Sequence, residues 1–191
     1  MANSKLIVVE GAQGAGKTTI TDFIRHSLKY TNLYRLSGTA DSSPAGLAKA
    51  KEMYKDLLDY TKKLENKSIN LLFDRTFFSE ENYCRLGKKE YSFTEVYEEL
   101  LKEFSNLDFN IYYITVYLKD TSLYEKRLSR AGKADVAYAK FGAENSIKQQ
   151  NTYLQMAEEI KEKYPNIQVI NIANDNDIEH TKSDLRNFIG F

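Results

Sequence analysis

The sequence has a single cysteine, no excess of either charge and no long apolar run, and each of these shortages excludes a class of protein. Its single cysteine, Cys84, rules out a disulfide within the chain. Lysine plus arginine equals aspartate plus glutamate at 27 each, so there is no global basic field for a nucleic-acid polymer or an anionic membrane. No apolar run approaches the roughly 20 residues that span a bilayer, and the opening MANSKLIVVE is charged too early for a signal peptide. We therefore expect a soluble, cytoplasmic protein that binds neither nucleic acid nor membrane.

Nothing in the sequence divides it into parts. Only two prolines occur, without an internal repeat or a Gly/Ser linker, so we expect residues 1–191 to form one domain. Apolar runs without strict alternation are typical of strands covered on both faces; they lie at 6–9, 69–73, 111–118 and 167–172, with a weaker fifth at 32–36. Helical patterns lie between them, at 20–28, 47–64, 93–104 and 143–163. This alternation predicts an α/β fold of three layers, with a five-stranded parallel sheet flanked by helices.

A glycine-rich motif follows the first expected strand and opens a helix. Gly11, four further residues, Gly16, Lys17 and Thr18 match G-x-x-x-x-G-K-[ST], the phosphate-binding P-loop. Its backbone N–H groups can turn toward phosphate oxygens, while the lysine adds a point charge and the threonine hydroxyl can hold Mg²⁺. The motif predicts a nucleoside triphosphate site formed by Gly11, Ala12, Gln13, Gly14, Ala15, Gly16, Lys17, Thr18 and Thr19.

Two charged residues follow the strand expected at 69–73. Asp74 stands at its carboxyl end, where ligands bind in open α/β sheets, so we expect it to face Mg²⁺ beside Thr18. Arg75 comes next, and a guanidinium there suits a second phosphate. The structural alternatives are an aspartate that caps the next turn and an arginine that forms a salt bridge.

A basic cluster near residue 130 has the composition of a lid. Arg127 and Arg130 are three residues apart, so on a helix they share one face, and Lys126 and Lys133 accompany them. Such arginines could close over a triphosphate as a small lid near residues 126–142. The alternative is a solvated helix face.

The sequence resembles the thymidylate kinase and deoxynucleoside kinase group of P-loop enzymes, and most of all bacterial thymidylate kinases. IVVEGAQGAGKTT is similar to their P-loop, including Glu10 and Gly14. DRTFFSEENY carries their D-R-x-x-x-S pattern and the aromatic residue after it, at Asp74, Arg75, Ser79 and Tyr83. The basic segment 126–133 occupies the position of their lid.

The resemblance implies roles for these residues. Lys17, Asp74, Arg75, Arg127 and Arg130 would be catalytic, while Glu10, Arg75, Ser79 and Tyr83 would bind the substrate. Ala173 and Asn174 would lie against the adenine of ATP, and the protein would be a homodimer. Three departures fall on the acceptor side: YRLSGTADSSP where the family has a T-R-E-P-G-G-like segment, Cys84 in place of a glutamine, and a preceding helix that offers Lys51 or Lys55 in place of an arginine.

Together these features lead us to expect an enzyme that uses ATP and Mg²⁺ to phosphorylate a deoxynucleoside monophosphate, dTMP first, giving dTDP. One alternative is a deoxynucleoside kinase, in which Glu10 or Asp74 would take the proton of the acceptor hydroxyl. Another is a P-loop ATPase switch, for which Gln13 is the candidate to position water.

Overall fold

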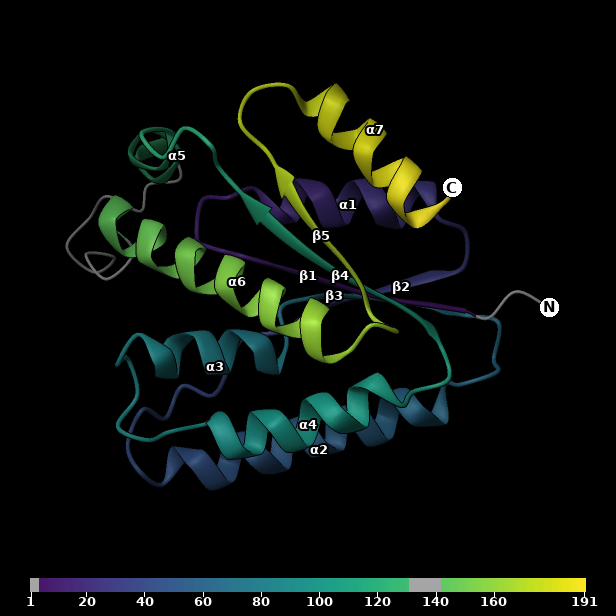
Figure 1. The fold of residues 1–191 in the computed structure, drawn as a ribbon, viewed down its shortest axis with the longest axis vertical. Coiled ribbons are helices and arrows are strands. Elements are labelled where there is room, and N and C mark those ends of the chain that lie inside the picture. Colours follow the sequence, from purple (N-terminus) through teal and green to yellow (C-terminus); the bar gives the residue numbers. More distant parts are fainter. Residues whose placement is uncertain (1–3, 131–141) are drawn as a thin grey trace.

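The computed structural model describes residues 4–130 and 142–191, and its centre is one parallel sheet (Figure 1). The strands are β1 (Lys5–Gly11), β2 (Thr31–Arg35), β3 (Asn70–Asp74), β4 (Asn110–Tyr117) and β5 (Gln168–Ala173), arranged in the order β2-β3-β1-β4-β5. All neighbouring pairs are parallel, with Val9 opposite Asp74 and Gly11 opposite Val116. The predicted α/β fold with a five-stranded parallel sheet is confirmed.

Helices cover both faces of the sheet, which gives three layers (Figure 1). One face carries α1 (Lys17–Ser27) and α7 (Ile178–Ile189). The other carries α2 (Gly46–Lys63), α3 (Phe77–Arg85), α4 (Thr94–Ser105) and α6 (Ala143–Lys163), while α5 (Leu123–Arg130) lies near the carboxyl end of β4. None of the helices in the described part of the chain combines the length and the hydropathy of a membrane-spanning segment.

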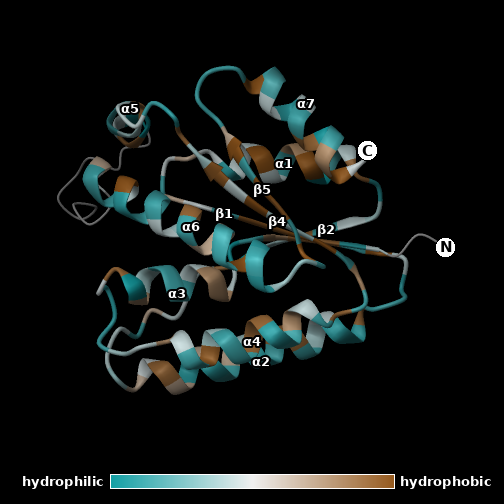
Figure 2. Ribbon diagram, viewed as in Figure 1, coloured by the Kyte–Doolittle hydropathy of each residue, from teal (hydrophilic) through white to brown (hydrophobic). Residues whose placement is uncertain are grey.

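Successive residues of each central strand enter different cores, which explains why the strand sequences do not alternate. In β1, Leu6 and Val8 pack under α2, α3, α4 and α6, whereas Ile7 and Val9 pack under α1 and α7. Figure 2 shows strands that are mainly hydrophobic between helices in which hydrophobic and hydrophilic residues alternate. Each apolar side chain that is fully buried in this way contributes about 1.5–3 kcal/mol relative to exposure.

The helix α3 is an element that the sequence patterns did not predict. It begins directly after Arg75 and Thr76, and its first two residues, Phe77 and Phe78, are buried. Phe78 packs against Tyr113 of β4 with ring centroids 4.7 Å apart, and Phe77 packs on Phe78 at 4.3 Å. These two rings therefore belong to the core rather than to a nucleobase site.

The carboxyl ends of the strands meet at one edge of the sheet. Gly11, Asp74, Tyr117 and Ala173 are the last residues of β1, β3, β4 and β5. The P-loop, the loop before α3, the start of α5 and the loop after β5 all leave from this edge. In open parallel sheets this is where ligands bind.

Candidate active site

The P-loop turns sharply between β1 and α1, and its glycines are required by its geometry. Gly14 and Gly16 have φ angles of 90° and 95°, in the left-handed region that favours glycine. A Cβ on Gly16 would lie 2.3 Å from Nδ2 of Asn174, closer than two such atoms can approach. The loop therefore fits tightly against the residues that follow β5.

Lys17, the first residue of α1, reaches back across the loop. Its Nζ donates to the carbonyl oxygens of Gly11 at 2.8 Å and Ala12 at 3.1 Å, and only 6% of the residue is exposed. The ammonium group is thus held at the mouth of the loop. A charge at this place can act on the phosphates of a bound nucleotide.

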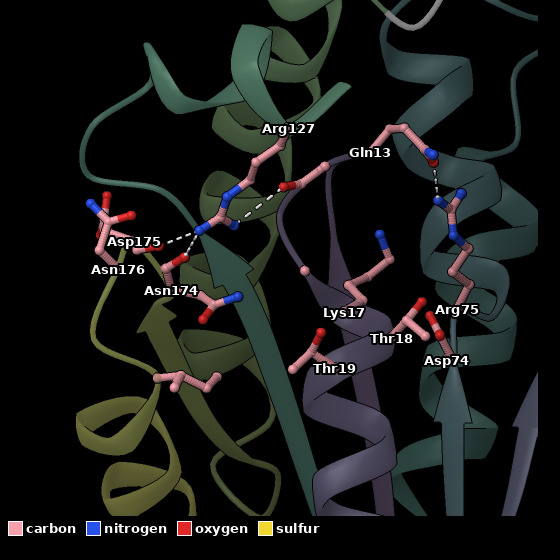
Figure 3. A pocket seen from close by; sticks show the side chains of 13 residues that line it. Gln13, Lys17, Thr18, Thr19, Asp74, Arg75, Arg127, Asn174, Asp175 and Asn176 are labelled. Carbon is pink, nitrogen blue, oxygen red and sulfur yellow. Dashed lines mark hydrogen bonds between the residues drawn. The ribbon is translucent and has the colours of Figure 1, made fainter. Parts of the chain in front are cut away.

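A cavity of about 490 Å³, here called the donor cavity, opens beside the P-loop (Figure 3). This is within the range of about 300–1,000 Å³ typical of ligand pockets. It is lined by Gln13, Gly14, Gly16, Lys17, Thr18, Thr19, Asp74, Arg75, Arg127, Asn174, Asp175, Asn176 and Ile178. Most of the residues predicted to bind a nucleoside triphosphate therefore surround one space.

Thr18 and Asp74 bring two oxygen groups to the donor cavity. Asp74 ends β3 and is 6% exposed, with Nε of Arg35 3.6 Å from its Oδ2. Among the described residues no group of three His, Cys, Asp or Glu side chains could enclose a metal ion. Mg²⁺ needs no such cage, because it is usually bound by one or two carboxylates together with substrate phosphates and water. The hydroxyl and the carboxylate fit that ion.

Arg75 lies between the P-loop and α3, on the side of Lys17 opposite Arg127 (Figure 3). Its Nη1 donates to Tyr83 OH at 2.8 Å, and its Nη2 donates to Oε1 of Gln13 at 3.0 Å. Its backbone has a φ of 73°, which is strained for a non-glycine residue. Because both acceptors are neutral oxygens, they orient the guanidinium without cancelling its charge.

A second cavity of about 470 Å³, here called the acceptor cavity, shares Gln13 and Arg75 with the first. It extends from Arg75 toward the loop between β2 and α2. It is lined by Gln13, Ser37, Gly38, Thr39, Ala40, Ser42, Arg75, Tyr83, Lys88, Lys89, Asn145 and Gln149. The two shared residues mark the place where the contents of the two cavities would meet.

Glu10 and Ser79 lie behind this junction, in the core. Glu10 is fully buried; it accepts hydrogen bonds from Thr76 N at 2.8 Å and from Ser79 Oγ at 2.7 Å. Ser79 Oγ is also 2.9 Å from the hydroxyl of Tyr153. Neither Glu10 nor Ser79 is among the described residues that line the two cavities. The structure thus places Glu10 and Ser79 in contact with each other, and the substrate contacts that the resemblance implies for them stay a prediction.

Burial raises the pKa of Glu10 from 4.5 to about 7, against the opposing effect of its hydrogen bonds with Ser79 and Thr76. The folded protein therefore retains a proton that the unfolded chain loses above pH 4.5, so the free energy of unfolding falls as the pH rises from 4.5 to about 7. Glu10→Gln removes this titration and keeps the hydrogen bond with Thr76. We expect the melting temperature of the variant minus that of the wild type to increase with pH up to about 7 and to be constant above it. A difference in melting temperature between variant and wild type that stays the same from pH 5 to 8 would contradict this prediction.

Arg127 lies at the other end of the donor cavity, where it joins two loops (Figure 3). Its Nη1 donates to the carbonyl oxygens of Gly14 and Ala15 at 3.4 and 3.3 Å. Its Nη2 donates to Asn174 O at 2.6 Å and to Asp175 O. Burial lowers the pKa of Arg127, although a guanidinium remains charged in proteins. In this structure Arg127 ties the P-loop to the loop after β5.

We expect Arg127→Met to weaken ATP binding more than acceptor binding. Loss of the four carbonyl contacts frees the two loops that border the donor cavity, so the KM for ATP should rise about tenfold while the acceptor KM stays within about twofold. Steady-state kinetics with each substrate varied in turn would measure both. Arg25→Met, an exposed change on α1, is the matched control. An equal rise in both KM values would refute this role.

Of the remaining predicted residues, those at the end of β5 lie beside the donor cavity, whereas those of the lid are exposed or lie outside the described residues. Asn174 donates from Nδ2 to Ala15 O at 2.8 Å and lines the donor cavity, while the Ala173 carbonyl accepts from Thr181. Arg130 is exposed at the end of α5, outside the described lining of either cavity. Lys133 and most of the predicted lid, 131–141, lie outside the described residues.

Several lining residues of the acceptor cavity were missed by sequence reasoning. Asn145 and Gln149 come from α6, where Gln149 Oε1 accepts from Gln13 N at 3.3 Å. No sequence motif relates these residues to the P-loop. The loop 37–42 could have been found, because it leaves the carboxyl end of β2. Lys51, which the helix before β3 offers in place of the family's arginine, pairs with Glu99 at 3.3 Å.

Comparison with known proteins supports the fold. No protein-family profile and no curated protein matches the sequence. The structure is similar to thymidylate kinase from Candida albicans, with a TM-score of 0.69 and 17% identity over 99% of this chain and 92% of that one. It is also similar to deoxyadenosine kinase from M. mycoides, with a TM-score of 0.60 and 18% identity over 96% of this chain and 98% of that one. The resemblance expected from the motifs is confirmed at the level of the fold: the chain has the architecture of thymidylate and deoxyadenosine kinases.

Proposed function

We propose that the protein is a kinase that transfers the γ-phosphoryl group of ATP to a deoxynucleoside monophosphate, dTMP first, giving dTDP. The observation that carries the proposal is the pair of cavities that meet at Gln13 and Arg75. One surrounds the P-loop lysine, and the other extends toward residues 37–42. Two substrates bound there would bring their phosphates together, and this proximity is what direct transfer requires.

The charges of the acceptor cavity favour an acceptor that already carries a phosphate. Among its described lining residues, Arg75, Lys88 and Lys89 are cations and none is acidic. Lys89 is paired with Glu80, so Arg75 and Lys88 supply the excess positive charge. A guanidinium held by neutral oxygens suits bidentate binding of a phosphate.

In the proposed reaction an oxygen of the acceptor phosphate attacks the γ-phosphorus, and the bond to the bridging oxygen breaks to release ADP. The P-loop N–H groups and Lys17 hold the donor phosphates, and Arg75 holds the acceptor phosphate. Thr18 and Asp74 would hold Mg²⁺, which when bound neutralises part of the phosphate charge. The acceptor phosphate is nucleophilic at neutral pH, so the chain needs no general base. Arg130 requires a closing motion of α5 to reach the phosphates.

A deoxynucleoside kinase is the nearest alternative, and it needs a carboxylate to take the proton of the acceptor hydroxyl. Glu10 is occupied in the core by Thr76 and Ser79, which leaves Asp74, on the donor cavity, as the available carboxylate. An ATPase switch would need a residue to position water. Gln13, the candidate, uses its side-chain oxygen to hold Arg75.

The test is release of ADP from ATP and Mg²⁺ in the presence of dTMP, dUMP, dGMP, dAMP, dCMP or the matching nucleosides. The proposal expects turnover with a monophosphate, highest with dTMP, and none with nucleosides. Turnover with nucleosides alone would replace the proposal by the nucleoside kinase. Release of ADP at the same rate with and without an acceptor would favour the ATPase switch.

The resemblance also leads us to propose that the enzyme is a cytoplasmic homodimer. Light scattering on the purified protein would measure its mass, and the mass of one chain would contradict the dimer.

A further inference from the structure

A buried ion pair that the proposed chemistry does not use borders the acceptor cavity. Glu80, on α3, is fully buried, and Nζ of Lys89 lies 3.4 Å from its Oε1 with only 7% of the lysine side chain exposed. The hydroxyl of Tyr91 donates to the same carboxylate oxygen. Removing two charges from water is costly unless they are well compensated. Such a pair therefore needs an explanation.

The two charged side chains bind the two backbone polar groups of one residue, Thr39. The N–H group of Thr39 donates to Glu80 Oε2 at 3.3 Å, and the carbonyl of Thr39 accepts from Lys89 Nζ at 2.6 Å. A carboxylate suits the donor and an ammonium group suits the acceptor, so both peptide groups form charge-assisted hydrogen bonds. Thr39 lies in residues 36–42, a stretch with neither helix nor strand. The ion pair thus supplies the anchoring that regular secondary structure supplies elsewhere.

Two further residues of the loop, Gly38 and Ser42, also contact the segments that carry Glu80 and Lys89. A Cβ on Gly38 would lie 2.7 Å from Glu80 Oε2, so any larger residue would push the carboxylate away. The carbonyl of Ser42 accepts from Glu90 N at 2.8 Å, which fixes the far end of the loop to the segment that carries Lys89.

The same loop forms one wall of the acceptor cavity, to which it contributes Ser37, Gly38, Thr39, Ala40 and Ser42. Arg75 and Gln13 mark the opposite, phosphate-binding end, because they also line the donor cavity. An acceptor whose phosphate lies at Arg75 must direct its sugar and base toward this wall. The position of the loop then determines which sugars and bases fit.

We propose that the Glu80–Lys89 pair selects the acceptor by fixing the 37–42 loop as a rigid wall of the acceptor cavity. Glu80 and Lys89 are positioning residues, since they act through the peptide groups of Thr39. The inference rests on the proposed function in one respect, namely that this cavity holds the acceptor.

The test uses the double variant Glu80→Gln/Lys89→Met. The single change Lys89→Met would leave a buried carboxylate without its counter-charge, whereas the double variant leaves no unpaired charge. Hydrogen exchange of the amides of residues 37–42 reports on the loop, and kcat/KM with each acceptor reports on selection. We expect amide exchange at least about tenfold faster, discrimination between the best and second-best acceptor reduced about tenfold, and a KM for ATP within about twofold of wild type.

Lys88→Met is the matched control for charge. It removes one positive charge from the same cavity, and we expect amide exchange in the loop to stay at the wild-type rate. Unchanged exchange in the double variant would overturn the anchoring, and faster exchange with wild-type discrimination would overturn the selection. If the wild type phosphorylates nucleosides instead, the proposed function fails while discrimination among nucleosides still tests the inference. If it phosphorylates no acceptor, both fail.

Discussion

Replacing Lys17 with alanine should abolish turnover while the fold survives. The ammonium group is held over the P-loop by the carbonyls of Gly11 and Ala12 and faces the donor cavity. No other described cation in that lining comes from the P-loop itself. Loss of one preorganised electrostatic contact to a transition state typically lowers kcat by about 10²–10³-fold, and we expect at least this loss. Initial rates of ADP release at saturating ATP would measure it.

The matched control is Lys161→Ala, an exposed lysine near the end of α6 that lines neither described cavity. It should retain wild-type rates. Circular dichroism and a thermal melt of Lys17→Ala distinguish loss of chemistry from loss of structure. A folded Lys17→Ala variant with full activity would end the P-loop assignment.

Arg75→Met should remove acceptor binding and leave ATP binding nearly intact. The guanidinium is positioned between the two cavities by Tyr83 and Gln13, and methionine keeps its length but loses its charge and its donors. We expect kcat/KM for the acceptor to fall at least about 100-fold while the KM for ATP changes less than about threefold. Varying each substrate at a fixed level of the other separates the two effects.

Arg25→Met again serves as the control for an exposed arginine. A loss confined to the KM for ATP would place Arg75 on the donor phosphates instead of the acceptor phosphate. An unchanged acceptor KM would remove the main support for a phosphorylated acceptor.

The parts of the site that lie close together in sequence were predictable. The spacing from Gly11 to Thr18 is fixed by what a phosphate-binding turn needs, and Asp74 is the last residue of a strand whose end the hydrophobic pattern marks. The fold followed from the alternation of buried strands with helices. In each case the information is local, because backbone sterics or the length of one strand decides the outcome.

Contacts between distant segments were not predictable from the sequence. Ser79 matches a motif, yet its hydroxyl bonds to Glu10, sixty-nine positions earlier in the chain. Arg127 has the spacing expected of a lid arginine, yet it bonds to carbonyls on two other loops. The Glu80–Lys89 pair has no sequence signature, because its role depends on contacts with the backbone of Thr39, which is distant in the sequence.

The central claim is transfer of phosphate from ATP to dTMP, and phosphorus NMR of one reaction mixture tests it most directly. Wild-type protein, ATP, Mg²⁺ and dTMP are mixed and the spectrum is followed with time. The account predicts that the monophosphate signal is replaced by the two coupled signals of a diphosphate, while ATP is converted to ADP in equal amount. An unchanged dTMP signal with growth of inorganic phosphate would contradict it.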